Sequence, residues 1–146
     1  MMTKTIRKTV LALLLITFHF SLLISIASCS EKRTPEEVAQ AEAMEVCQAC
    51  YDRLIKGDYE GFLSFRNDID NIPAELRSQI VDAMKMYIDT EERLHGGIKS
   101  VMATKAQMDS TLNVMKVFLI LSYGNGTDEE VVVPMVTDSN GQWRMK

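Results

Sequence analysis

The spacing of hydrophobic residues divides this chain of 146 residues into three regions. Residues 10–26 are almost all apolar and have no period. Between residues 34 and 95, apolar residues recur every three or four positions, which predicts helices. From residue 98 onward, apolar residues alternate with polar ones or form a long apolar run, which predicts strands. Helices followed by antiparallel strands are typical of an α+β domain, in which the helices cover one face of a sheet.

Three helices are predicted from their ends and their apolar faces. They cover residues 34–56, 59–65 and 73–95. Thr34 and Glu37 can form a capping box at the start of the first helix, and Gly57 suits its end. Asp58 is placed to cap the second helix. The apolar face of the first helix gathers Ala39, Ala43, Met44, Cys47, Cys50, Tyr51, Leu54 and Ile55. The apolar face of the third gathers Leu76, Ile80, Ala83, Met84, Tyr87 and Leu94.

Four strands follow the helices. They cover residues 98–108, 111–123, 129–137 and 142–146. The second strand is strongly apolar, so we expect it in the middle of the sheet. Turn sequences at residues 124–127 and 138–141 indicate an antiparallel meander. We therefore expect one domain over residues 34–146, with the helices packed on a curved four-stranded antiparallel sheet.

The apolar residues 10–26 belong to a leader with the layout of a secretory signal, because basic residues precede them and small residues follow. A transmembrane helix is the alternative, but it needs about 20 apolar residues. The residues Ile-Ala-Ser-Cys at positions 26–29 resemble a lipobox, the signal for lipid attachment in bacterial lipoproteins. We expect removal of residues 1–28 and attachment of acyl chains such as palmitate to Cys29. An ordinary signal peptide, with Cys29 as a bystander, is the other alternative.

Lipidation of Cys29 predicts a protein anchored to the cell envelope, with residues 29–33 as a short tether. Ser30 replaces the aspartate that retains some lipoproteins at the inner membrane, so the outer membrane is expected. The chain has a net charge of −4, and loss of the three basic side chains in the leader leaves −7. An acidic domain argues against binding nucleic acid or anionic headgroups. The expected partners are the membrane, through the lipid, and an unknown protein or small molecule.

Cys47 and Cys50 form a C-x-x-C pair on the apolar face of the first predicted helix. Their spacing brings the Cα atoms within disulfide range, so a redox pair is one interpretation. A reactive thiol favours a helix N-terminus or nearby cations, however, and these cysteines lie several turns into the helix. Buried core thiols are therefore the favoured interpretation. Since no second pair or histidine cluster completes a metal site, we expect no cofactor.

Four short motifs mark junctions between the predicted elements. They are Gly57-Asp58-Tyr59, Gly96-Gly97-Ile98, Tyr123-Gly124-Asn125-Gly126-Thr127 and Asn140-Gly141-Gln142-Trp143-Arg144. With these motifs in this order, the chain resembles the nuclear transport factor 2-like superfamily, also described as a cystatin-like cone. Within it, the chain is similar to small Bacteroidetes lipoproteins that are grouped as a domain of unknown function. The resemblance implies a curved sheet wrapped around helices, in a superfamily that holds enzymes, binding proteins and structural modules.

The resemblance also implies candidate pocket residues, because ketosteroid isomerase shares this fold. That enzyme uses a carboxylate base with an oxyanion hole of a tyrosine and a protonated aspartate. The corresponding residue types here are Tyr51, Asp58, Tyr59 and Tyr87. Asp58 is better explained as a helix cap and the tyrosines as core aromatics, and we identify no inward-facing acidic residue on the strands. His95 is expected to be an ordinary surface residue at a helix end.

Eight methionines follow the leader, namely Met44, Met84, Met86, Met102, Met108, Met115, Met135 and Met145. We expect them to fill gaps in the core, although a methionine-lined cone could also hold an apolar ligand. Because no catalytic set is recognisable, we expect a non-catalytic envelope lipoprotein whose domain binds a partner protein or a small ligand. The alternative is an isomerase- or hydratase-like enzyme that uses the cone pocket.

Overall fold

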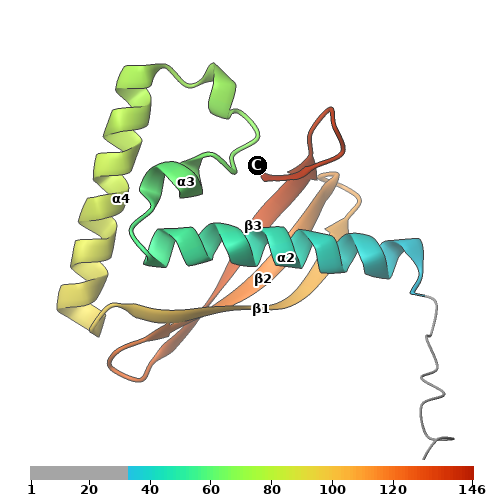
Figure 1. The fold of residues 1–146 in the computed structure, drawn as a ribbon. Coiled ribbons are helices and arrows are strands. Elements are labelled where there is room, and N and C mark those ends of the chain that lie inside the picture. Colours follow the sequence, from blue (N-terminus) through green and yellow to red (C-terminus); the bar gives the residue numbers. More distant parts are fainter. Residues whose placement is uncertain (1–32) are drawn as a thin grey trace, which may run out of the picture. The chain divides into compact units, whose positions relative to one another are not determined.

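The computed structural model describes residues 33–146. In this range helices come first and strands last (Figure 1). The elements are α2 (Pro35–Ile55), α3 (Tyr59–Leu63), a 3-10 turn (Ile69–Asn71), α4 (Ala74–His95), β1 (Ile98–Asp109), β2 (Val114–Tyr123), β3 (Asp128–Thr137) and β4 (Trp143–Met145). The predicted leader, the lipidation site Cys29 and the tether up to residue 32 lie outside the described residues. Across residues 33–146, no helix has the length and apolar character needed to cross a membrane.

The four strands form one antiparallel sheet in the order β1-β2-β3-β4. The long apolar strand β2 lies inside the sheet, as predicted. Its alternate residues Met115, Val117, Leu119, Leu121 and Tyr123 are buried. Because side chains alternate across a strand, these five residues share the inner face of the sheet, on which α2 packs. The predicted α+β architecture, with helices on a four-stranded antiparallel sheet, is therefore confirmed.

The start of β2 differs from the prediction. The strand begins at Val114, because the three preceding residues form a turn. Asp109 Oδ1 accepts hydrogen bonds from the backbone N–H groups of Thr111 and Leu112, over 3.0 and 3.1 Å. Asn113 then adopts a φ of 51°, a left-handed conformation that asparagine tolerates better than most residues. A carboxylate that binds the backbone in this way competes with strand pairing, and the apolar character of Leu112 concealed it.

The second helix is shorter than predicted and ends at Leu63. The backbone that follows pairs with the last strand instead of continuing the helix. The N–H of Met145 donates to the carbonyl of Phe65, and the N–H of Asn67 donates to the carbonyl of Met145, both over 2.8 Å. The final strand therefore satisfies the carbonyl of Phe65 and the N–H of Asn67, where the chain leaves the helix.

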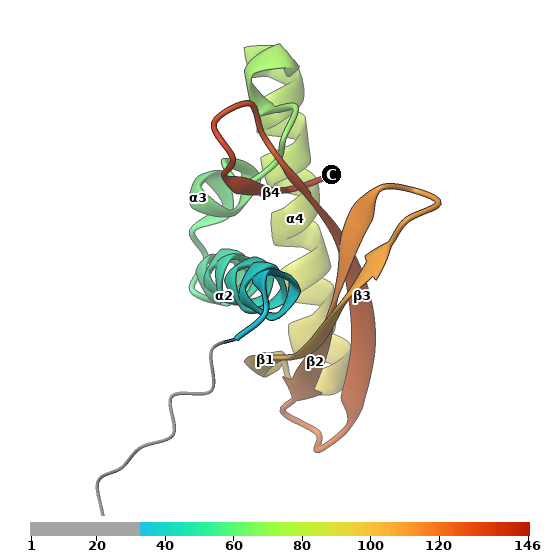
Figure 2. The same cartoon turned by 90° about the vertical axis from the view of Figure 1, so that its right-hand side faces the viewer.

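Helix α2 crosses the inner face of the sheet (Figures 1 and 2). Its buried residues are Ala43, Cys47, Cys50 and Leu54, all on the predicted apolar face. The amide of Gln48 binds the edge strand β1 from this helix. Gln48 Nε2 donates to the carbonyl of Val101 over 2.8 Å, and the N–H of Ala103 donates to Gln48 Oε1 over 2.7 Å. This amide satisfies backbone groups that the edge strand would otherwise leave without a strand partner.

Helix α4 runs crosswise to α2, near the C-terminal end of α2 (Figure 1). Val81 is its buried residue. Near the start of α4, Arg77 Nε donates to the carbonyl of Ile72 over 2.9 Å. Past its end, the N–H of Asn125 in the β2–β3 turn donates to the carbonyl of His95 over 2.8 Å. The Arg77 bond joins α4 to the loop directly before it, whereas the Asn125 bond joins the C-terminal end of α4 to the β2–β3 turn.

Candidate functional site

A cleft of about 440 Å³ lies between α4, the C-terminal part of α2 and the sheet. We call it the α4 cleft. Its walls comprise Tyr51 and Leu54 of α2, Phe62 of α3, Ile80, Ala83, Met84 and Tyr87 of α4, and Ile98, Leu121 and Val131 of the strands. Four consecutive members of the predicted apolar face of α4 therefore face the cleft rather than a closed core.

The walls of the α4 cleft are apolar apart from two phenol groups. None of its ten described lining residues carries a charged side chain. The ring of Tyr51 packs edge-on against Phe62, with 5.4 Å between the ring centroids. Burial raises the pKa of Tyr51 and of Tyr87, so both hydroxyls are protonated and neutral at neutral pH. The cleft therefore offers a ligand a large apolar surface and two neutral hydrogen-bonding groups.

A tyrosine and a carboxylate form a hydrogen-bonded pair close to Tyr87. The hydroxyl of Tyr123 donates to Glu129 Oε2 over 2.6 Å. Burial raises the pKa of Tyr123, and the bond to Glu129 and the proximity of Tyr87 raise it further. The Tyr123 ring is buried, whereas Glu129 is exposed. Tyr123 is therefore held as a neutral donor whose proton is directed at a solvated carboxylate.

The position of Glu129 contradicts the expectation that the strands offer no inward-facing acidic residue. Glu129 pairs with Leu121, whose side chain lies on the inner face. The alternation along β3 carried this signal, because Glu129, Val131 and Val133 occupy every second position. Glu129 is the first residue of the predicted strand, next to a turn, where the strand alternation is least certain to assign a face of the sheet. The sequence therefore did not identify it as inward-facing.

The structure brings together two of the four predicted pocket residues. Tyr51 and Tyr87 line the α4 cleft, although Tyr87 is 43% exposed and is not the core aromatic that was expected. Asp58 and Tyr59 are not among the residues that line it. Asp58 Oδ1 accepts a hydrogen bond from the N–H of Gly61 over 2.9 Å. Asp58 therefore caps α3, which is the role that the sequence favoured over a catalytic one. Tyr59 is the first residue of α3 and is half-buried.

His95 lies at the C-terminal end of α4, as predicted. Its ring lies against Tyr123, with 5.3 Å between the ring centroids. His95 Nε2 is 3.8 Å from Glu91 Oε2, and Nδ1 is 3.4 Å from Asn125 Nδ2. These neighbours are an aromatic ring, a carboxylate and an amide rather than a nucleophile. His95 therefore helps to hold the end of α4 against the β2–β3 turn.

Cys47 and Cys50 are buried free thiols on the side of α2 that faces the sheet. Burial raises the pKa of Cys47 to about 12 and also raises the pKa of Cys50. A thiolate nucleophile is therefore strongly disfavoured, in agreement with the favoured interpretation as core thiols. Within residues 33–146, no three His, Cys, Asp or Glu side chains are grouped so that they could bind a metal ion.

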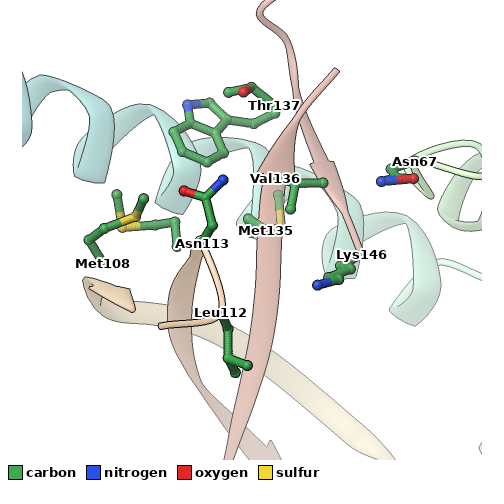
Figure 3. Close-up of a pocket in the computed structure, with 10 residues that line it drawn as sticks. Asn67, Met108, Leu112, Asn113, Met135, Val136, Thr137 and Lys146 are labelled. Carbon is green, nitrogen blue, oxygen red and sulfur yellow. The ribbon is translucent and has the colours of Figure 1, made fainter. Parts of the chain in front are cut away.

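A second pocket, of about 390 Å³, lies where the β1–β2 turn approaches β3 and β4. We call it the methionine pocket. Its walls comprise Asn67, Met108, Leu112, Asn113, Met115, Met135, Val136, Thr137, Trp143 and Lys146. Figure 3 shows Met108 and Asn113 from the β1–β2 end, and Met135 and Thr137 from β3, around this pocket. The sequence predicted that the methionines fill gaps in the core, but Met86, Met102 and Met108 are exposed. It also did not indicate which methionines share a pocket.

Comparisons with known proteins bear on the fold. No family model matches the chain, and no curated protein matches it. Among solved structures, a candidate NTF2-like transpeptidase of Campylobacter jejuni superposes with a TM-score of 0.52, where NTF2 is nuclear transport factor 2. The two chains are 12% identical, and the match covers 69% of this chain and 94% of the other. The described domain has the NTF2-like fold. At this identity the likeness concerns the NTF2-like fold alone, and the activity named for the Campylobacter protein is not transferred.

Proposed function

We propose that this chain is an envelope lipoprotein whose NTF2-like domain binds a small apolar molecule in the α4 cleft without transforming it. The observation that carries the proposal is the cleft itself, with uncharged walls drawn from α2, α3, α4 and three strands. Between a small molecule and a partner protein, a concave apolar cleft favours the small molecule. Its volume of about 440 Å³ lies within the range of ligand pockets, about 300–1,000 Å³.

The walls of the cleft suit a neutral ligand. A charged ligand would lose its hydration without gaining a charged partner among the ten lining residues. An apolar ligand would instead cover surface that α4 leaves open, and the hydroxyls of Tyr51 and Tyr87 could bind a single polar group on it. Met84 adds an adaptable wall, because its unbranched side chain adjusts to irregular shapes.

Filling the cleft tests the proposal. Nile red, a neutral apolar dye, should fluoresce more strongly when it binds the full-length chain. Ala83→Trp places a large side chain in the cleft and should weaken dye binding by about tenfold or more, because the ring occupies ligand volume. The matched control is Met86→Trp, since Met86 lies on the same helix, is 71% exposed and does not line the cleft. Equal dye affinity in the two variants would rule out the α4 cleft as the binding site.

The membrane anchor is a separate part of the proposal and rests on the lipobox-like residues 26–29. A lipid anchor also agrees with the resemblance of this sequence to small Bacteroidetes lipoproteins. Cys29→Ala should move the protein out of the membrane fraction or leave an uncleaved precursor, because no acyl chain can be attached. Cys47→Ala is the control and should leave fractionation unchanged. Membrane association that persists in Cys29→Ala, with cleavage at another residue, would contradict lipidation.

An isomerase- or hydratase-like enzyme is the second candidate, and the Tyr123–Glu129 pair favours it. A carboxylate within 2.6 Å of a tyrosine hydroxyl could serve as a base beside a hydrogen-bond donor. Glu129→Gln should then abolish turnover of an α,β-unsaturated ketone or a hydroxy acid, whereas Glu130→Gln should retain it. Glu130 is the adjacent residue on β3 and faces the opposite side of the sheet. Ligand binding that survives Glu129→Gln, without turnover in the unmodified chain, would favour the binding protein.

A further inference from the structure

One row of paired residues across the inner face of the sheet consists of four methionines, one from each strand. Met108 of β1 pairs with Met115 of β2, Met115 pairs with Met135 of β3, and Met135 pairs with Met145 of β4. We call these residues the methionine row. Directly paired side chains in antiparallel strands have Cβ atoms about 4.5–5.5 Å apart, so neighbouring thioethers are within reach of one another.

The methionine row runs from solvent into the core. Met108 is 44% exposed, whereas Met115 and Met135 are 3% and 0% exposed. Met108, Met115 and Met135 all line the methionine pocket, and Met108 is the member of the row that reaches solvent; Figure 3 labels Met108 and Met135 there. At the inner end of the row, Cys50 Sγ lies 3.3 Å from Met145 Sδ.

The chemistry of the methionine pocket favours a soft cation. Thioether sulfur selects soft metal ions such as Cu(I), whereas Mg²⁺ and Ca²⁺ require oxygen ligands, often carboxylates. None of the ten described lining residues has an acidic, histidine or cysteine side chain. Trp143 lines the same pocket, and the face of an indole ring attracts cations. Lys146 also lines it but is exposed, so solvent and salt screen its charge.

We propose that Met108, Met115 and Met135 form a binding site for a soft monovalent metal ion, of which Cu(I) is the biological representative. The three thioethers supply neutral sulfur ligands, and Trp143 covers the bound ion. Thioethers need no deprotonation before they bind a metal, so affinity stays nearly constant between pH 5 and pH 8. The site is distinct from the α4 cleft, with which it shares no lining residue.

The test uses Ag(I), which has the ligand preferences of Cu(I) and no redox chemistry in air. Ag(I) is titrated into the purified full-length chain in detergent. Trp143 is the sole tryptophan of the chain, so its fluorescence reports binding at this pocket. We expect quenching that is complete at one equivalent. Cu(I), added anaerobically, should compete with Ag(I) for the same site.

Methionine-to-leucine variants decide whether the row supplies the ligands. Met108→Leu combined with Met115→Leu conserves side-chain volume and removes two thioethers. It should weaken Ag(I) binding by at least about tenfold, as even loss of a residue that only supports a metal ligand can do. Met86→Leu combined with Met102→Leu is the control, because both residues are exposed and outside the pocket. The control should bind as the unmodified chain does.

Two results would overturn the proposal. One is equal Trp143 quenching by Ag(I) in the row variant and the control variant. The other is quenching that Cys47→Ala or Cys50→Ala removes while the row variant retains it, which would assign the ion to the thiols. If the double variant unfolds, Met108→Leu alone replaces it, since Met108 is the exposed member of the row. Ala83→Phe, which fills part of the α4 cleft without adding a second tryptophan, should leave Ag(I) quenching of Trp143 unchanged, which separates this site from the ligand proposed for the α4 cleft.

Discussion

The two long helices have nearly the same length but are held in different ways. Helix α2 has 21 residues, and four of them are buried, three of which belong to the core shared with the sheet. Helix α4 has 22 residues, and Val81 is the buried one. Leu76, Met86, Tyr87 and Leu94 of α4 are large apolar residues that are exposed. Apolar residues recur along α4 at regular helical spacing, as they do along α2, so the difference arises from what each helix meets in the fold.

The comparison shows that an apolar face indicates which side of a helix turns inward, but not whether that side is covered. Helix α2 lies over the inner face of the sheet, where β2 presents an unbroken row of buried residues. Helix α4 crosses near the end of α2, and its C-terminal end is hydrogen-bonded to the β2–β3 turn. The uncovered part of its apolar face then becomes a wall of the α4 cleft.

The largest difference between the helices should come from removing one leucine from each. Leu54→Ala on α2 should lower the free energy of unfolding by about 3 kcal/mol, because the Leu54 side chain is only 6% exposed and its buried apolar contacts are lost. Leu94→Ala on α4 should lower it by about 0.5 kcal/mol or less, because Leu94 is 66% exposed. Urea unfolding of both variants measures the two values. Equal losses would mean that α4 packs as tightly as α2.

The attachment of the end of α4 can be tested at Gly96, which ends the helix with a φ of 73°. A Cβ atom added there would lie 3.2 Å from backbone atoms of Gly124 in the β2–β3 turn. Gly96→Ala should therefore cost about 2 kcal/mol of unfolding free energy, from backbone strain and from this close approach. Gly126→Ala is the control, since Gly126 has a φ of 84° but open space around it, and should cost about 1 kcal/mol.

Thermal unfolding of Gly96→Ala and Gly126→Ala gives the contribution of the contact as the difference between their stabilities. Identical stabilities would show that Gly96 acts through its backbone conformation alone. In that case the close approach of α4 to the β2–β3 turn would not contribute to holding the helix.

Alkaline pH should act on α2 through its buried thiols. Folding raises the pKa of Cys47 to about 12 from an ordinary value of about 8.5. The thiol stabilises the fold fully below pH 8.5, and this contribution declines as the pH rises toward 12. The expected slope is about 1.4 kcal/mol per pH unit for one thiol, because the unfolded chain releases a proton that the folded chain keeps.

Urea unfolding between pH 8 and pH 10.5, under reducing conditions, measures this slope. Cys47→Ala should reduce the slope by about 1.4 kcal/mol per pH unit, the contribution of one thiol proton. Met86→Ala, on the exposed side of α4, should leave the slope unchanged. A slope that is the same in the Cys47→Ala variant and the unmodified chain would contradict a buried, protonated Cys47.

The smallest expected effect concerns the helix starts. Thr34 Oγ1 accepts a hydrogen bond from the N–H of Glu37 over 3.2 Å, and the N–H of Thr34 donates to Glu37 Oε2 over 2.6 Å. Helix α4 begins after Pro73 with no side-chain cap. Thr34→Ala should cost about 1 kcal/mol of unfolding free energy. Thr90→Ala, inside α4, should cost less than about 0.5 kcal/mol of unfolding free energy. A loss for Thr90→Ala that exceeds the loss for Thr34→Ala would contradict the expected role of the capping box.

Much of the fold could be predicted because its signals are local. The capping box at Thr34, the cap at Asp58 and the buried face of α2 all depend on residues within a few positions of one another. The turn at residues 111–113 was misassigned, because Leu112 resembles the apolar strand that follows. What decides that turn is the carboxylate of Asp109, which binds the backbone of the residues after it.

The candidate site could be predicted only in part. Tyr51 and Tyr87 were named from the sequence and do line the α4 cleft. Asp58 was named with them, but its carboxylate caps α3. The alternation along β3 gives the face of Glu129, but the Tyr123–Glu129 pair required the register of β2 and β3, which places Glu129 opposite Leu121 and within reach of Tyr123. A short-range pattern cannot supply a register, because the register depends on how two strands align over their whole length.

The sequence by itself determined the order of the helices and strands, the face of α2 that is buried and the meander of the sheet. These features follow from periodicity and turn chemistry, which act over a few residues. Only the tertiary structure decided that α4 remains partly uncovered and that four methionines meet in one row. Both depend on the packing of segments far apart in the chain, where shape and register, rather than local preference, set which side chains meet.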